Sequence, residues 1–119
     1  MKNSLTILIR RAPYGQIHAA EALRHMGGAL SDGIQTTVLL VDSGVYVARD
    51  GQDPGATGFT SLVEPLAKGI AKGARVYMHL PSAQARGLLN DSHLMAGVDY
   101  TDDVGLARLL AESDMVMVY

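Results

Sequence analysis

The chain has 119 residues, the length of one ordinary globular domain, and we expect residues 1–119 to fold as a single domain. Hydrophobic residues make up 48% and charged residues 18%, which excludes a disordered chain, and the net charge of −2 gives no basic surface for a nucleic-acid partner. The absence of cysteine excludes disulfides, thiolate metal sites and a cysteine nucleophile.

Short apolar runs rich in β-branched residues predict the strands. The runs are nearly continuous rather than alternating, which is typical of parallel strands that are covered on both faces. In chain order, we expect strands at residues 5–9, 37–41, 74–80, 98–100 and 115–119.

Segments with apolar residues at helical spacing separate these strands. In chain order, we expect helices over residues 17–30 and 61–71, a third from about residue 81, and a fourth after residue 101. Ser61, three residues before Glu64, suggests a capping box for the second helix. Residues 43–58 form the longest irregular stretch. We expect Tyr46, in this stretch, and Tyr14, earlier in the chain, to lie in loops that contact partners. The alternation predicts an α/β fold with a mostly parallel sheet and helices on both faces.

The apolar runs are too short for a signal peptide or a membrane-spanning helix. The first run, residues 5–9, is stopped by Arg10 and Arg11, whereas a membrane span needs roughly 20 apolar residues. We therefore expect a cytoplasmic protein with no membrane partner.

In an open parallel sheet, ligands bind beyond the carboxyl ends of the strands. Arg10 and Arg11 follow the first expected strand and precede a helix N-terminus, where they could hold an anion. Alternatively, they are solvated or pair with Asp42. The stretch matches neither a Walker loop nor a dinucleotide-binding fingerprint.

Histidines are the other candidates for chemistry. His79 ends the third expected strand and could act as a general base near Ser82, although spacing fixes no orienting acid; alternatively, it hydrogen-bonds to the backbone. His18, His25 and Glu21 share a helix face and could bind a metal, but a Glu21–His25 pair is the commoner arrangement. We expect neither a metal nor a cofactor.

A further histidine, His93, lies in an expected loop and gives only a weak signal. The methionines are expected to fill the core or an interface.

Several short motifs, spread over nearly the whole chain, resemble those of one known family. Three of them are residues 12–15 with the helix that ends at residue 30, the turn at residues 42–46, and the closing residues 109–119. The fourth is residues 79–88, where small residues precede Arg86, Gly87 and Leu88. Together they resemble the DsrE/DsrF-like proteins of sulfur relay, and most closely the DsrF/TusC branch.

This resemblance implies a flavodoxin-like three-layer sandwich with a sheet of about five strands. It also implies trimers or hexamers of identical or homologous subunits. In catalytic members, a cysteine carries a persulfide; by this resemblance its position falls on His79, and that of a second cysteine on Ser82. Neither side chain can carry sulfane sulfur. The leading hypothesis is therefore a non-catalytic subunit that scaffolds or partners a cysteine-bearing homologue in an intracellular sulfur-relay oligomer.

Two other hypotheses remain open. The chain could be a homo-oligomer that binds a small molecule or anion at the strand ends, or an enzyme that uses His79 as a general base. The residues expected to bind a ligand are Arg10, Arg11, Tyr14, Asp42, His79 and Ser82.

Overall fold

The computed structural model describes residues 3–50, 52, 61–89 and 94–119. They contain one five-stranded sheet in the order β4-β3-β2-β1-β5, and every pair of neighbouring strands is parallel. The strands are β1 (Ser4–Ile9), β2 (Gln35–Leu40), β3 (Arg75–His79), β4 (Val98–Thr101) and β5 (Met115–Val118). Each lies where the sequence predicts a strand.

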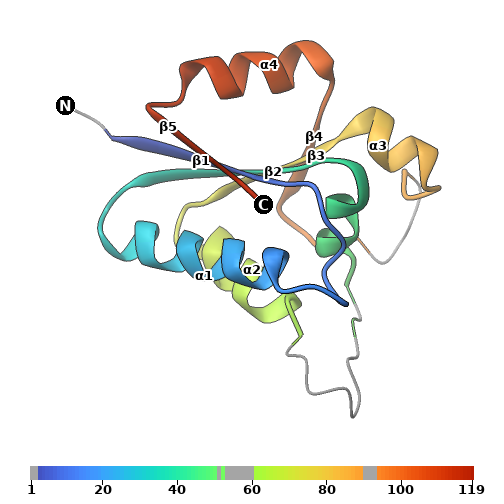
Figure 1. The fold of residues 1–119 in the computed structure, drawn as a ribbon, viewed down its shortest axis with the longest axis horizontal. Helices are drawn as coiled ribbons and strands as arrows, with labels where there is room; N and C mark the ends of the chain where they lie inside the picture. Colours follow the sequence, from blue (N-terminus) through green and yellow to red (C-terminus); the bar gives the residue numbers. More distant parts are fainter. Residues whose placement is uncertain (1–2, 51, 53–60, 90–93) are drawn as a thin grey trace.

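Helices lie on both faces of this sheet, as expected. They are α1 (His18–Ser31), the 3₁₀ helix η1 (Asp42–Ala48), α2 (Val63–Ala71), α3 (Leu80–Ala85) and α4 (Asp103–Glu112). Helices α1 and α2 cover one face, and α4 crosses the opposite face (Figure 1). This confirms the flavodoxin-like three-layer α/β architecture. None of the described helices combines the length and the apolar composition needed to cross a membrane.

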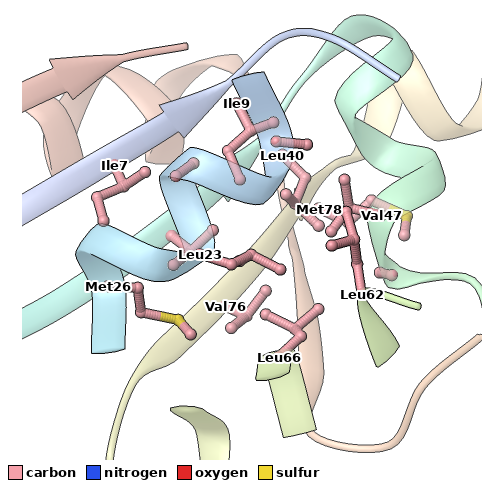
Figure 2. Close-up of a cluster of buried hydrophobic side chains, with 14 of the residues drawn as sticks. Ile7, Ile9, Leu23, Met26, Leu40, Val47, Leu62, Leu66, Val76 and Met78 are labelled. Carbon is pink, nitrogen blue, oxygen red and sulfur yellow. The ribbon is translucent and has the colours of Figure 1, made fainter. Parts of the chain in front are cut away.

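The core lies between the sheet and the layer of α1 and α2 (Figure 2). Alternate residues of the three central strands point into it, and each is at most 1% exposed: Ile7, Ile9, Val38, Leu40, Val76 and Met78. Leu23 of α1 and Leu66 of α2 pack against them from the helix layer. Burial of each large aliphatic side chain contributes about 1.5–3 kcal/mol, so this face holds most of the stability.

The opposite face is covered much more thinly. Helix α4 has no fully buried residue, and its Val104 is 66% exposed. All four residues of the edge strand β5 are exposed although all are apolar. Their exposed fractions are Met115 47%, Val116 44%, Met117 38% and Val118 54%. Because neighbouring residues of a strand point to opposite faces, β5 exposes apolar side chains on both faces of this edge of the sheet.

Three local expectations were wrong. The expected capping box is absent from the described residues, because α2 starts one residue later, after Leu62, and Ser61 only accepts a long 3.4 Å bond from Val63 N–H. The stretch expected to be irregular contains η1 instead. Tyr46 lies in η1 rather than in a loop, whereas Tyr14 lies in a loop as expected, and both are half-buried against the core. His93 and residues 53–58 lie outside the described residues.

Gly44 marks the closest approach between two chain segments at the site end of the sheet. A Cβ at this position would lie 2.0 Å from the carbonyl oxygen of Ile9, a backbone atom that cannot rotate away. Just beside it, the Ile9 carbonyl accepts the Val41 N–H at 3.0 Å. Glycine therefore allows η1 to start directly against the end of β1.

We predict that Gly44→Ala lowers the free energy of unfolding by about 3 kcal/mol or more, because the clash forces the backbone apart. Gly28→Ala is the matched control: it lies on an exposed part of α1 with open space around it, and should raise stability by about 0.5–1 kcal/mol. Urea unfolding followed by circular dichroism measures both. Similar stability of Gly44→Ala and wild type would contradict the packing described here.

Candidate functional site

The chain changes sides of the sheet between β3 and β4. The connection that leaves β3 packs into the main core through Ala83, Leu88 and Met95. The connection that leaves β4 is α4, which runs over the other face (Figure 1). In open α/β sheets, such a switch point between neighbouring strands leaves a crevice at their carboxyl ends, where ligands commonly bind.

His79 stands at this switch point and is held by hydrogen bonds on both ring nitrogens. Its Nδ1 lies 2.7 Å from Ser82 Oγ, and its Nε2 lies 2.6 Å from Asp103 Oδ1. Ser82 Oγ also accepts the backbone N–H of Asp42 at 2.9 Å. The three contacts join the carboxyl ends of β2, β3 and β4 into one chain of hydrogen bonds.

The direction of this chain follows from the available protons. An ionised Asp103 can only accept, so His79 Nε2 carries the hydrogen. In a neutral imidazole, Nδ1 then accepts, and Ser82 donates its hydroxyl proton to it. Ser82 thus donates its hydroxyl hydrogen to His79 and accepts the Asp42 N–H, so each of these groups has a hydrogen-bond partner.

The backbone of Asp42 is bent to make its contact. Its φ of +50° lies in the left-handed region, which residues other than glycine rarely adopt and which aspartate tolerates better than most. Strained residues of this kind persist where surrounding contacts fix them and are concentrated at functional sites. The N–H of Asp42, aimed at Ser82, supplies one such contact.

Serine, histidine and aspartate in series have the composition of a hydrolytic triad, but the accessibility differs. Ser82 is 6% exposed, whereas a nucleophile must be reached by a substrate carbonyl. The Asp103 side chain is 82% exposed, so the carboxylate at the other end faces water rather than a closed site. The geometry therefore fits a structural role, in which the hydrogen bonds hold three strand ends together, better than a role of Ser82 as a nucleophile.

A shallow hollow of about 340 Å³ adjoins this network at the end of β4. It is lined by Leu80, Tyr100, Thr101 and Asp102. Tyr100 is 42% exposed there, and Asp102 caps α4 by accepting Gly105 N–H at 2.8 Å.

The six residues expected to bind a ligand fall into two groups. Asp42, His79 and Ser82 belong to the network just described. The other three, Arg10, Arg11 and Tyr14, line a second hollow, of about 400 Å³, beyond the end of β1. Ser43 also lines the second hollow. Because Ser43 directly follows Asp42, the network and the hollow are adjacent at this point of the chain. Neither arginine forms an ion pair with Asp42.

The histidines and the glutamate of α1 take separate partners. Glu21 pairs with Arg24 at 2.5 Å rather than with His25, and this guanidinium lowers the pKa of Glu21. His25 hydrogen-bonds through Nδ1 to the hydroxyl of Tyr119, whose pKa is raised by partial burial. His18 lies against Arg11. Among the described residues, no three histidine, aspartate or glutamate side chains cluster closely enough to hold a metal ion.

Sequence reasoning missed Asp103 as the partner of His79. The signal was available, because Asp103 follows the strand that pairs with β3: His79 and Thr101 are in register, and the carboxylate follows two residues later. Only the pairing of β4 with β3 turns that sequence position into a contact.

Comparison with known proteins now decides the family. The sequence matches the DsrE/DsrF-like family over residues 3–119. The chain belongs to the DsrE/DsrF-like family. This DsrE/DsrF-like chain is 35% identical to the uncharacterized protein MJ0989 of Methanocaldococcus jannaschii, over 96% of this chain and 97% of that one. It is 32% identical to the intracellular sulfur oxidation protein DsrF of Allochromatium vinosum, over 94% of this chain and 93% of DsrF.

Solved structures agree on the fold of this DsrE/DsrF-like chain. The crystal structure of the ychN protein from E. coli has a TM-score of 0.89 at 22% identity, and covers 98% of this chain and 99% of its own. Protein MTH1491 of Methanobacterium thermoautotrophicum has a TM-score of 0.76 at 14% identity, and covers 99% of this chain and 100% of its own. At these identities the likeness supports the three-layer fold and no more.

We predict that Ser82→Ala lowers the free energy of unfolding by about 1–3 kcal/mol, because it leaves the Asp42 N–H and His79 Nδ1 without their partner. Asp103→Asn is the matched variant at the exposed end of the same chain of bonds. It should cost no more than about 1 kcal/mol, because water replaces its contact. Chemical denaturation measures both. A larger effect of Asp103→Asn than of Ser82→Ala would contradict this order.

We also predict that a serine-directed fluorophosphonate leaves the intact mass of the folded chain unchanged, since Ser82 is buried and already hydrogen-bonded. A chain unfolded in urea serves as the control for nonspecific modification. Labelling of Ser82 in the folded protein, with a rate that falls in His79→Ala, would instead support hydrolytic chemistry.

Proposed function

We propose that this chain is a non-catalytic DsrE/DsrF-like subunit of an intracellular sulfur-relay oligomer, in which it partners a cysteine-bearing homologue. The relative named DsrF links the family to sulfur oxidation inside the cell. The proposal brings that setting to this chain, assigns it a supporting role and places it in the cytoplasm.

The observation that carries the proposal is the chemistry at the end of β3. By resemblance, the sulfur-carrying cysteine of catalytic relatives would stand at His79, and a second at Ser82. Here the two side chains are hydrogen-bonded to each other. His79 is also hydrogen-bonded to Asp103, and Ser82 accepts the backbone N–H of Asp42. No cysteine occurs anywhere in the sequence, so no thiol of this chain can accept sulfane sulfur.

The open edge of the sheet supports association with another subunit. Soluble proteins normally protect an edge strand with charges, proline or a bulge. Strand β5 has none of these: it reads Met-Val-Met-Val, is exposed along its length, and, among the strands that the structure describes, pairs only with β1 through its other edge. A subunit that covers β5 would bury this apolar surface and satisfy its unpaired backbone groups.

The experiment is affinity purification of the tagged chain from its native host under reducing conditions, followed by mass spectrometry. We expect a cysteine-bearing DsrE/DsrF-like homologue in stoichiometric amount, and sulfane sulfur on that homologue alone. Recovery of this chain alone as a monomer would contradict the proposal. Recovery of a homo-oligomer would contradict the part of the proposal that names a homologous partner.

Met117→Lys tests the proposed contact surface, because a charge in the middle of β5 opposes burial at an interface. We expect it to reduce recovery of the partner at least about tenfold. Gln84→Lys adds the same charge to an exposed position on α3 and should leave recovery unchanged. Equal recovery with both variants would place the interface elsewhere.

A further inference from the structure

The hollow beyond the end of β1 is distinct from the network around His79. It has a volume of about 400 Å³, within the range of small-molecule sites, and it opens between the loop that precedes α1 and the start of η1. Its polar lining comes from Arg10, Arg11, Gln16 and Ser43, and Tyr14 forms a wall.

Tyr14 is fixed in that wall by its hydroxyl. The hydroxyl donates to Gln52 Oε1 at 2.7 Å and accepts Leu62 N–H at 3.2 Å. These bonds tie the Tyr14 side chain to Gln52 and to the residue before α2, so the aromatic ring has a defined place. The wall of the hollow is therefore preformed rather than assembled by a ligand.

The charge of the hollow is positive, and none of the described residues that line it carries a carboxylate. Two guanidinium groups line it, and His18 lies 3.3 Å from Arg11 through Nε2. Two cations of the helix layer, by contrast, have acidic partners: Arg24 pairs with Glu21, and Lys68 pairs with Glu64. Within the described part of the chain, Arg10 forms no side-chain hydrogen bond and Arg11 binds only Gln16 and His18.

Donors outnumber acceptors among the groups that line the hollow. Arg11 Nη1 donates to Gln16 Oε1 at 3.0 Å, which occupies one lone pair of the amide oxygen and leaves the NH₂ group of Gln16 as a donor. Arg10 has only donors, and the Ser43 hydroxyl can donate. A lining of donors around two uncompensated positive charges matches an anion with several acceptor oxygens, because guanidinium groups bind such oxygens in pairs.

From this lining we infer that the hollow binds a tetrahedral oxyanion of the phosphate or sulfate class, gripped by Arg10 and Arg11 with Gln16 and Ser43 as further donors. The volume exceeds that of an inorganic anion, so the site accommodates a small organic group attached to it. This binding role is independent of the sulfur-relay proposal, because it needs neither a thiol nor a partner subunit.

Isothermal titration of the full chain with inorganic phosphate, and separately with sulfate, at constant ionic strength tests the inference. We expect saturable binding of at least one of them with one site per chain, and the tighter anion identifies the class. The double variant Arg10→Gln/Arg11→Gln should weaken binding at least about tenfold, because charge-assisted hydrogen bonds to the anion are lost.

Arg108→Gln is the control for each single variant, Arg10→Gln and Arg11→Gln, since it removes one positive charge from an exposed position on α4, on the opposite side of the sheet. It should bind as the wild type does, and all variants should melt at similar temperatures because the altered side chains are exposed. Absence of saturable binding of either anion to the wild type would overturn the inference. So would an equal loss in Arg108→Gln and in the single variants, which would indicate only an effect of net charge.

Discussion

The unequal covering of the two faces of the sheet governs the rest of this structure. A parallel sheet is stable when both faces are buried. Here the face under α1 and α2 is packed with fully buried aliphatic side chains, whereas α4 on the other face has no fully buried residue. The imbalance continues to the edge, where β5 exposes all four of its apolar side chains. The isolated chain thus buries one face of the sheet well, and the apolar surface that stays exposed is what supports the proposed association.

The carboxyl edge of the same sheet carries the residues of both candidate sites. At its centre, the hydrogen bonds from Asp42 through Ser82 and His79 to Asp103 connect three strand ends. Every group in that series has a partner, and Ser82 is buried, so the network holds the edge together without offering a free nucleophile. Beyond β1, by contrast, two arginines line a hollow in which none of the described lining residues is acidic. The ends of β2, β3 and β4 are thus joined by internal hydrogen bonds, whereas the end of β1 borders an open hollow.

The sequence predicted the fold well, because apolar runs and helical stripes report burial directly. All five strands appear where they were expected, and the helix expected after residue 101 begins at Asp103, where Gly105 N–H donates to the side chain of Asp102. The start of α2 was misplaced because the serine hydroxyl is too far from the helix to cap it in the expected way. Local patterns cannot report contacts between distant strand ends. His79 and Asp103 meet only because β3 and β4 are neighbours in the sheet, and the six expected ligand residues separate into two groups for the same reason.

The central claim is that β5 is covered by another subunit in the working protein. Amide hydrogen exchange at residues 115–118 tests it most directly, comparing the assembly isolated from the native host with the same material after dilution to the monomer. The account predicts strong protection of these amides in the assembly and much faster exchange in the monomer, while β2 in the centre of the sheet remains protected in both. Equal exchange of residues 115–118 in the two states would show that β5 is not the interface and would contradict the account.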